Sequence, residues 1–416
     1  MNTAQTPINT NLHIPALVTR HAGDAAFYWS QWDASTHSPL MVQQQREDLT
    51  RLLTAHLDGL RVAGSAGWDR ACTELTRWQG AGEVFVTTLL ALESPEASDR
   101  LKTVWNTLQR DPHRLLRGLI SAVVWNGTQA AQPWVEYWST SAHTPPLLRV
   151  AALRALRLVD PALPCPATVL QSGLASENAM IRAAACRLLR STRGYDLADG
   201  AALLSDPDRA VRADVAIAGG YAGDKRCWPV LHNAVADQIT DYNRLTGRPK
   251  QHVLRRLTRW VRHLGILTPA NQPGTAQLLQ LLPSRLTLLF ILHHGDCRFL
   301  PVVESFMDNP DCARLAGWVW SALTGVDLEL AGLCHPPHRL EGDPGATDNL
   351  DPGLPDPDRR LIQHSHLPRP DGHPVLLGQA MTQETLQTLP DNVPLALLWI
   401  ARQRLRLHAQ QYAETT

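Results

Sequence analysis

One helical phrase recurs along the middle of this chain at nearly constant intervals. It reads LLRVAALRALRLV at 147–159, MIRAAACRLLR at 180–190 and AVRADVAIAG at 210–219, with a looser copy, CARLAGWVWSA, at 312–322. In the first copy the apolar residues follow the spacing of one buried helix face, and the arginines fall largely off that line. The repetition therefore predicts an all-α protein in which similar helices stack on one another.

The arginines of these helices indicate the period. Starting from Arg117 in an earlier helix at 111–125, the intervals to Arg149, Arg182 and Arg212 are 32, 33 and 30 residues. A further 102 residues lead to Arg314, which is room for about three more units, and SRLTLLFILHHGD at 284–296 is expected to fill one of them. Units of this length predict helix pairs arranged as an α-solenoid.

A second repeated phrase predicts the turns between paired helices. The chain reads GDKRCWPVL at 223–231 and GDCRFLPVV at 295–303, each about three helical turns after an amphipathic helix begins. Glycine can adopt the left-handed conformation that ends a helix, and aspartate can cap the N–H groups of the next helix. Each phrase is therefore interpreted as a helix, a tight turn and a second helix.

The phosphate-loop alternative for these glycines is disfavoured by the residues around them. In AGGYAGDKRCW an aspartate stands between the last glycine and Lys225, no Ser or Thr follows the lysine, and a helix is expected before the glycines. A P-loop needs a strand before it and the order Gly-Lys-Ser/Thr. Asp-Pro and Asn-Pro pairs at 111–112, 206–207 and 309–310 fit helix starts instead, because proline suits the first turn of a helix.

Helix pairs with an Arg-x-Ala-Ala-like helix and a Gly-Asp turn resemble HEAT repeats of the short, alanine-rich bacterial kind, over roughly residues 100–330. AHLDGLRVAGSAGW (55–68), GEVF (82–85) and ARLAGWVWSALTGVDLE (313–329) further resemble a bacterial HEAT-repeat family of uncharacterised activity, often encoded near type VI secretion genes. Gly317-Trp318 and Trp320 stand where that family is expected to have a smaller or charged residue in the helix. The resemblance implies a gene neighbourhood and no chemical activity.

Three regions are expected. Residues 1–99 form an N-terminal helical cap region, because an end repeat must cover an apolar face, and 100–330 form the HEAT-like solenoid. Residues 331–416 hold a partly irregular segment and a C-terminal helix at 394–411 that can dock back on the repeats. The nine prolines between 335 and 375 are expected to exclude regular helix there.

Composition excludes several classes of protein. The 39 basic and 39 acidic residues cancel, so bulk charge does not draw the chain to nucleic acid or to an anionic membrane. The N-terminus lacks the pattern of a secretory signal, and no apolar run is long enough to span a bilayer. Seven scattered cysteines with no Cys-x-x-Cys pair argue against a disulfide framework. A cytoplasmic protein is expected.

Two clusters contain residue types that carry chemistry elsewhere. CHPPHRLEGD at 334–343 and the histidines after it offer zinc-ligating side chains: Cys334, His335, His338, Glu341, Asp343, His364, His366 and His373. Their spacing does not match known structural zinc sites, and a polar loop is the favoured interpretation. HHGDC at 293–297 is expected to be a solvent-exposed turn, since adjacency in sequence does not place a base beside a nucleophile. No catalytic residue, cofactor or metal is predicted.

The candidate contact surface lies in a basic segment. RLTGRPKQHVLRRLTRWVRHLG at 244–265 has seven Lys or Arg side chains and no acid, and Arg255, Arg259 and Arg262 share a helix face. They are predicted to bind an acidic partner or an anion such as the DNA backbone, and the alternative is an ordinary solvated face.

These observations predict a non-enzymatic scaffold, adaptor or chaperone that binds another protein, plausibly a type VI secretion effector or structural component. One alternative is an immunity protein that occludes a secreted toxin. Another is a HEAT-like DNA-binding protein or DNA glycosylase, which the zero net charge and the lack of a recognisable catalytic acid disfavour. The sequence leaves the partner and the oligomeric state open.

Overall fold

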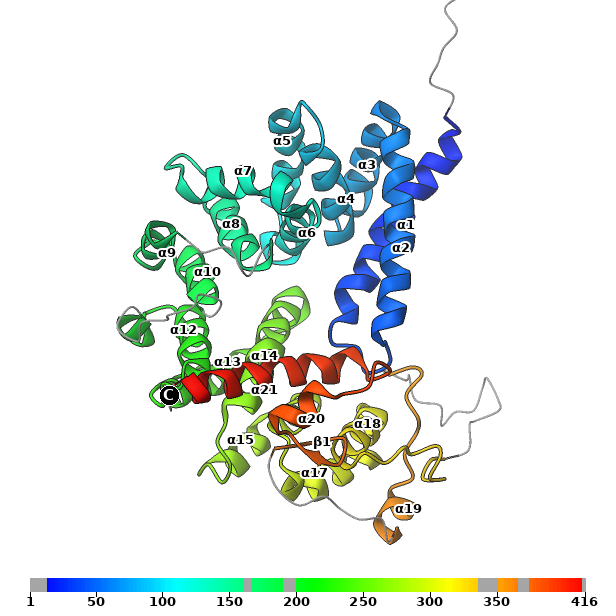
Figure 1. Ribbon diagram of the computed structural model, residues 1–416, viewed down its shortest axis with the longest axis vertical. Coiled ribbons are helices and arrows are strands. Elements are labelled where there is room, and N and C mark those ends of the chain that lie inside the picture. The colour runs from blue at the N-terminus through cyan, green and yellow to red at the C-terminus, as the bar shows by residue number, and fades with distance from the viewer. Residues whose placement is uncertain (1–12, 160–165, 190–199, 336–350, 366–373, 414–416) are drawn as a thin grey trace, which may run out of the picture. The chain divides into compact units, whose positions relative to one another are not determined.

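The computed structural model describes residues 13–159, 166–189, 200–335, 351–365 and 374–413 (Figure 1). These residues form about 20 helices and one two-stranded hairpin, so the predicted all-α class is confirmed. The chain divides into two compact units, residues 1–35 with 44–188, and residues 36–43 with 189–416. None of the helices in the described ranges combines the length and apolar character that a bilayer crossing requires.

The first unit contains ten helices within the described ranges: α1 (Pro15–Ser35), α2 (Gln43–Val62), α3 (Ser65–Trp78), α4 (Ala81–Leu92), α5 (Ala97–Leu108), α6 (Pro112–Trp125), α7 (Gly127–Thr140), α8 (Pro146–Val159), α9 (Ala167–Leu174) and α10 (Ala179–Leu189). Alternate helices pack together, α4 on α6 and α6 on α8, while α1 and α3 cover α4. Gly118 permits the closest of these contacts, since a Cβ there would lie 2.1 Å from the Ala81 carbonyl oxygen. α1 confirms the helix expected near the N-terminus.

The second unit contains the remaining described elements: η1 (Ala202–Ser205), α12 (Arg209–Tyr221), α13 (Cys227–Arg244), α14 (Gly247–Leu267), α15 (Thr275–Leu281), α16 (Ser284–His294), η2 (Cys297–Phe299), α17 (Leu300–Ser305), η3 (Phe306–Asp308), α18 (Ala313–Thr324), α19 (Arg359–His364), β1 (Val375–Leu376), β2 (Gln379–Ala380), α20 (Gln383–Gln387) and α21 (Leu395–Ala413). Here η marks a 3₁₀ helix.

Alternate helices also form a row in this unit. α12 packs on α14, α14 on α16 and α16 on α18, while α13 packs against both α12 and α14. Trp260 of α14, Phe290 of α16 and Trp320 of α18 are almost fully buried in the one core cluster that these helices share. Packing with sequence neighbours at each step is the arrangement expected of helical repeats.

Both Gly-Asp phrases are turns between helices, as predicted. Gly223 and Gly295 have left-handed φ values of 86° and 73°, and Gly295 ends α16 with its N–H bonded to Ile291 O at 2.8 Å. Asp224 Oδ1 accepts from the N–H of Arg226 at 2.9 Å, and Asp296 Oδ1 accepts from the N–H of Arg298 at 3.0 Å.

The repeated arginine in the two phrases has a local role. The side chain of Arg226 also donates to Asp224, and that of Arg298 donates to Asp296. Each carboxylate therefore accepts hydrogen bonds from both the backbone N–H and the guanidinium of the same arginine. These bonds lower the pKa of Asp224. Burial alone would raise the pKa of Asp296, but the bonds and charge of Arg298 outweigh it and the pKa is lowered. Asp-x-Arg is thus a capping unit for a helix start.

The Asx-Pro pairs precede helices by different distances from those expected. Only Pro112 stands at the first position of its helix, whereas α12 begins two residues after Pro207 and α18 three residues after Pro310. The reason is a turn closed by the Asx side chain, in which Asp206 Oδ1 accepts from the N–H of Asp208 at 2.8 Å. Asn309 makes the equivalent bond to Asp311 at 3.1 Å.

Two of the periodic arginines have one shared structural role. Arg182 donates from Nη1 to the carbonyls six and five residues earlier, those of Ser176 and Glu177, both at 2.8 Å. Arg212 makes the same pair of bonds to Asp206 at 2.7 Å and Pro207 at 3.1 Å. The repeated arginine therefore holds the turn before its own helix, which is a structural reason for an arginine at the same point of these two copies.

The C-terminal region departs from the predicted irregular segment. The six-residue helix α19 (Arg359–His364) lies inside 335–375. It begins two residues after Pro357, and the Asp358 side chain caps it by accepting from the N–H groups of Arg360 and Leu361. The expectation that prolines exclude helix there is wrong for 359–364. The β1–β2 hairpin was not predicted, and it covers the second Gly-Asp turn through a 2.8 Å bond from Val375 N to Gly295 O.

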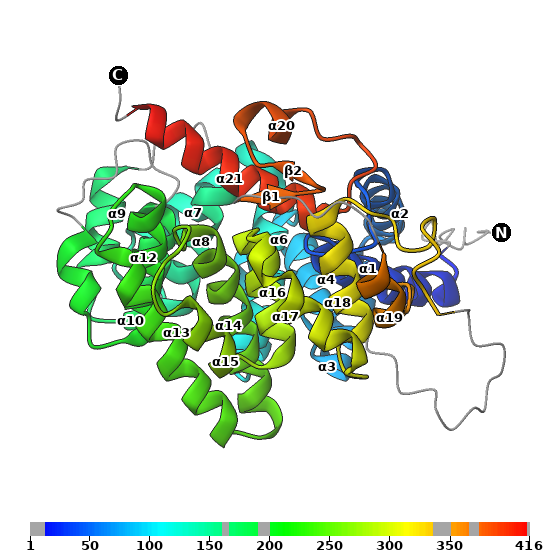
Figure 2. The ribbon, with the colours of Figure 1, turned by 90° about the horizontal axis from the view of Figure 1, so that it is seen from below.

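Helix α21 confirms the prediction that the last helix docks on the preceding ones. It contacts α12, α14 and α20, and Figure 2 shows it beside the hairpin and α20. Arg404 of α21 is 6% exposed and donates to the carbonyls of Ile266, His293 and His294 at 3.0, 2.7 and 2.9 Å. These carbonyls close the C-terminal ends of α14 and α16, where the helix dipole favours a cation.

Candidate functional site

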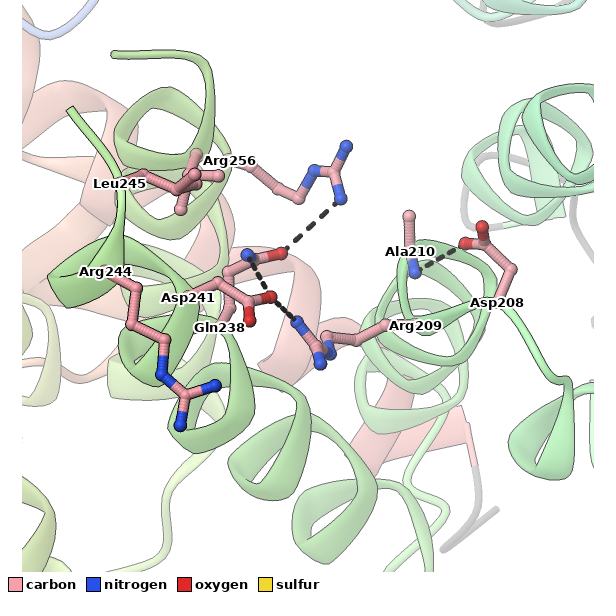
Figure 3. A pocket seen from close by; sticks show the side chains of 9 residues that line it. Asp208, Arg209, Ala210, Gln238, Asp241, Arg244, Leu245 and Arg256 are labelled. Atoms are coloured by element: carbon pink, nitrogen blue, oxygen red, sulfur yellow. Dashed lines mark hydrogen bonds and ion pairs between the residues drawn. The ribbon is translucent and has the colours of Figure 1, made fainter. Parts of the chain in front are cut away.

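A pocket of about 420 Å³ lies where the N-terminus of α12 faces the last turn of α13 and the first half of α14 (Figure 3). Its lining is Asp208, Arg209, Ala210, Gln238, Asp241, Arg244, Leu245, Val253 and Arg256, and we call it the arginine pocket. The lining contains three guanidinium groups, from three helices, and two carboxylates, which leaves one excess positive charge. A volume of this size is within the range of ligand-binding pockets.

The two carboxylates of the pocket are already engaged. Asp208 caps α12, where its Oδ1 accepts from the N–H groups of Ala210 at 2.7 Å and Val211 at 3.2 Å. Asp241 accepts from Arg209 Nη1 and, at 3.2 Å, from Gln238 Nε2. Figure 3 shows Arg209 and Gln238 directed at the same carboxylate from two helices. The α12 side of the pocket is therefore fixed by a hydrogen-bonded ion pair.

The α14 side of the pocket is fixed by neutral acceptors. Arg256 donates to Gln238 Oε1 at 3.4 Å and contacts His252 Nε2 at 3.1 Å, and its guanidinium lies 5.8 Å from the centre of the Trp260 ring. Gln238 is almost fully buried. Its amide oxygen accepts from Arg256 and its amide nitrogen donates to Asp241, so it links the two residues. Arg256 thus has two contacts with uncharged groups at the pocket.

Arg244 differs from the other two arginines of the pocket. It is the last residue of α13 and is exposed. Within the described part of the chain it has no hydrogen-bond or ion-pair partner, and no dashed line reaches it in Figure 3. A guanidinium group presents several N–H donors in a planar fork, and those of Arg244 are available to a ligand.

The three arginines predicted to bind a partner do not form one exposed row. Arg255 is exposed on α14, as expected of a solvated face. Arg259 forms an ion pair with Asp214 of α12, a carboxylate that is 1% exposed. Arg262 is half-buried, and its Nε atom is buried without a hydrogen-bond partner among the described residues. The role in binding stays a prediction for all three, of which only Arg255 is exposed.

Burial sets the electrostatics around Arg262. It lowers the pKa of the Arg262 guanidinium to about 10 and that of Arg404 to about 10 as well. His293 of α16 is almost fully buried, and burial together with the charges of Arg262 and Arg404 lowers its pKa to about 3. His293 Nδ1 lies 2.7 Å from the carbonyl of Leu289, which makes it a donor of the neutral ring. Both arginines and the neutral histidine belong to the interior of this unit.

The interpretation of HHGDC as a solvent-exposed turn is wrong. His293, His294 and Asp296 are 3%, 1% and 0% exposed. The twin phrase at 223–226 is mostly exposed, so the local sequence alone did not decide the outcome. The second turn is covered by residues far along the chain, β1 through Val375 and α21 through Arg404.

Most of the cluster with zinc-ligating side chains lies outside the described residues, which hold only Cys334, His335 and His364 of it. Burial raises the pKa of the Cys334 thiol to about 11. His335 Nδ1 lies 3.6 Å from Asp358 Oδ2, and His364 Nδ1 lies 2.7 Å from the Arg360 carbonyl. In the described ranges no group of three potential metal ligands converges.

Sequence reasoning singled out Arg244 and Arg256 within the basic segment but missed Asp208, Arg209, Gln238 and Asp241. A signal was present, since Arg209 and Asp241 are 32 residues apart, about one repeat period. Both belong to one helix pair, α12 with α13, so the start of the first helix meets the end of the second.

Comparisons of this chain with protein-family models, with curated proteins and with solved structures find no match.

Proposed function

We propose that this chain is a non-enzymatic, protein-binding scaffold of the HEAT-like α-solenoid type, an adaptor or chaperone for type VI secretion components or effectors. The observation that supports it best is the row of alternate helices from α12 to α18, joined by tight turns. A row of this kind presents exposed side chains on a rigid surface, which suits extended recognition of another protein with little rearrangement.

The association with type VI secretion rests on the sequence resemblance at 55–68, 82–85 and 313–329. The last of these stretches contains a helix end and a capped turn. Gly325 ends α18 with a φ of 75°, and Asp327 Oδ1 accepts from the N–H groups of Glu329 and Leu330. Leu-Thr-Gly-Val-Asp-Leu is thus another helix end followed by a capped turn, the same device as in the Gly-Asp phrases.

A binding experiment tests this function. The purified full chain is titrated by biolayer interferometry against each purified product of the neighbouring genes. A saturable complex with one of them supports the proposal. Rescue of growth when that partner is a co-expressed toxin assigns the chain to immunity instead. Release of bases from damaged duplex DNA, with no protein complex, contradicts the scaffold proposal in favour of a glycosylase.

A further inference from the structure

The arginine pocket combines charge and apolar surface in a way that specifies a ligand class. Arg244 is exposed and unpartnered within the described residues, and Arg256 is held at the pocket by the neutral amide of Gln238. Arginine pairs with carboxylates through two parallel N–H bonds, which are short and about twice as strong as bonds between neutral groups. Leu245 and Val253, on either side of the α13–α14 turn, add apolar surface to the same wall.

The two carboxylates of the lining argue against a polyanion. A run of phosphates would have to lie against Asp208 and Asp241 as well as against the arginines, and like charges placed together oppose binding. A peptide segment does not carry that penalty along its whole length, because only its acidic side chains need reach the guanidinium groups. Its apolar side chains can pack on Leu245 and Val253.

We propose that the arginine pocket binds an acidic peptide segment of the protein partner, with a Glu or Asp carboxylate paired to Arg244. An aliphatic side chain next to that acid lies on Leu245 and Val253. This inference rests on the proposed function for the source of the segment. It does not rest on it for the chemistry, which a free peptide can test.

The probe is a fluorescein-labelled, amidated Gly-Glu-Glu-Leu-Glu-Gly peptide, titrated with the full chain by fluorescence anisotropy. Arg244→Ala removes the unpartnered guanidinium and is expected to weaken binding about tenfold, as loss of a charge-assisted bond does. Arg402→Ala is the matched control, since it removes an exposed arginine of α21 that does not line the pocket. It is expected to leave the affinity within about twofold of the wild type.

Three results overturn the proposal. They are no saturable binding of the peptide, equal weakening by Arg244→Ala and Arg402→Ala, or tighter binding of a labelled oligothymidylate than of the peptide. A Gln-substituted peptide must bind more weakly than the Glu peptide if carboxylates are recognised. The experiments distinguish failure of the pocket proposal from failure of the proposed scaffold function. A partner bound with equal affinity by wild type and Arg244→Ala contradicts only the pocket, and absence of any partner contradicts only the function.

Discussion

Arg404 donates a hydrogen bond of 2.7 Å from Nη2 to the backbone carbonyl of His293, which lies 111 residues earlier in the chain. The same guanidinium reaches the carbonyls of Ile266 and His294, so one buried cation joins the C-terminal ends of two stacked helices to α21. Helix C-termini carry partial negative charge and unsatisfied carbonyls, which explains why an arginine is stable there.

Replacing Arg404 by Leu is therefore expected to destabilise the second unit by about 3 to 5 kcal/mol, because three buried carbonyls lose their donor. Arg404→Lys keeps the charge but not the fork, and is expected to cost less. Urea unfolding followed by far-UV circular dichroism measures both variants. Equal stability of Arg404→Leu and wild type would contradict the role given to this residue.

The arginines at 255, 259 and 262 provide a matched series on one helix. Arg255→Met is expected to change the free energy of unfolding by less than about 0.5 kcal/mol, since its side chain is exposed. Arg259→Met removes the ion pair with the buried Asp214 carboxylate and is expected to cost about 2 to 4 kcal/mol, less than for a fully buried pair because the Arg259 side chain is 29% exposed.

Arg262→Met is expected to be neutral or to stabilise the protein by up to about 2 kcal/mol. The substitution removes a buried, unpartnered Nε and a cation whose pKa burial has already lowered to about 10. Thermal and urea unfolding of the three variants in parallel give the order. A destabilisation by Arg262→Met as large as that by Arg259→Met would contradict the account of Arg262.

The two Gly-Asp turns make a second matched pair. Gly223→Ala is expected to cost about 1 kcal/mol from the left-handed backbone alone. Gly295→Ala is expected to cost about 2 to 4 kcal/mol, because a Cβ there would also lie 2.9 Å from the Val375 carbonyl oxygen. Chemical denaturation of the two variants measures the difference in the free energy of unfolding. Equal losses of stability would contradict the inference that the hairpin lies too close to Gly295 for a Cβ atom.

Helices and turns were accessible from sequence because both are set by near neighbours. The apolar spacing at 147–159 and 210–219 and the Gly-Asp pairs predicted α8, α12 and the turns. Which turns are buried by distant segments of the chain could not be predicted in this way. Similar phrases at 223 and 295 became an exposed and a buried turn, because β1 and Arg404 of α21 cover the second. Likewise, the partner of Arg259 is 45 residues away, at Asp214.

Acid should destabilise the second unit through His293. Its pKa is about 3 in the folded chain against 6.5 unperturbed, so the unfolded chain binds the proton first as pH falls. Stability is then fully present above about pH 6.5 and declines toward pH 3 by about 1.4 kcal/mol per pH unit, or about 2 kcal/mol between pH 7 and 5. His293→Asn, which keeps a donor for the Leu289 carbonyl, is expected to remove that part of the pH dependence. An unchanged slope in urea unfolding would contradict it.

Hydrogen–deuterium exchange of the full chain, alone and mixed with each neighbouring gene product, tests most directly whether the chain is a protein-binding scaffold that uses the arginine pocket. The account predicts that one product slows exchange in peptides covering residues 208–214 and 238–256, which surround Arg244. Unchanged exchange in every mixture, or protection confined to other regions, would contradict it.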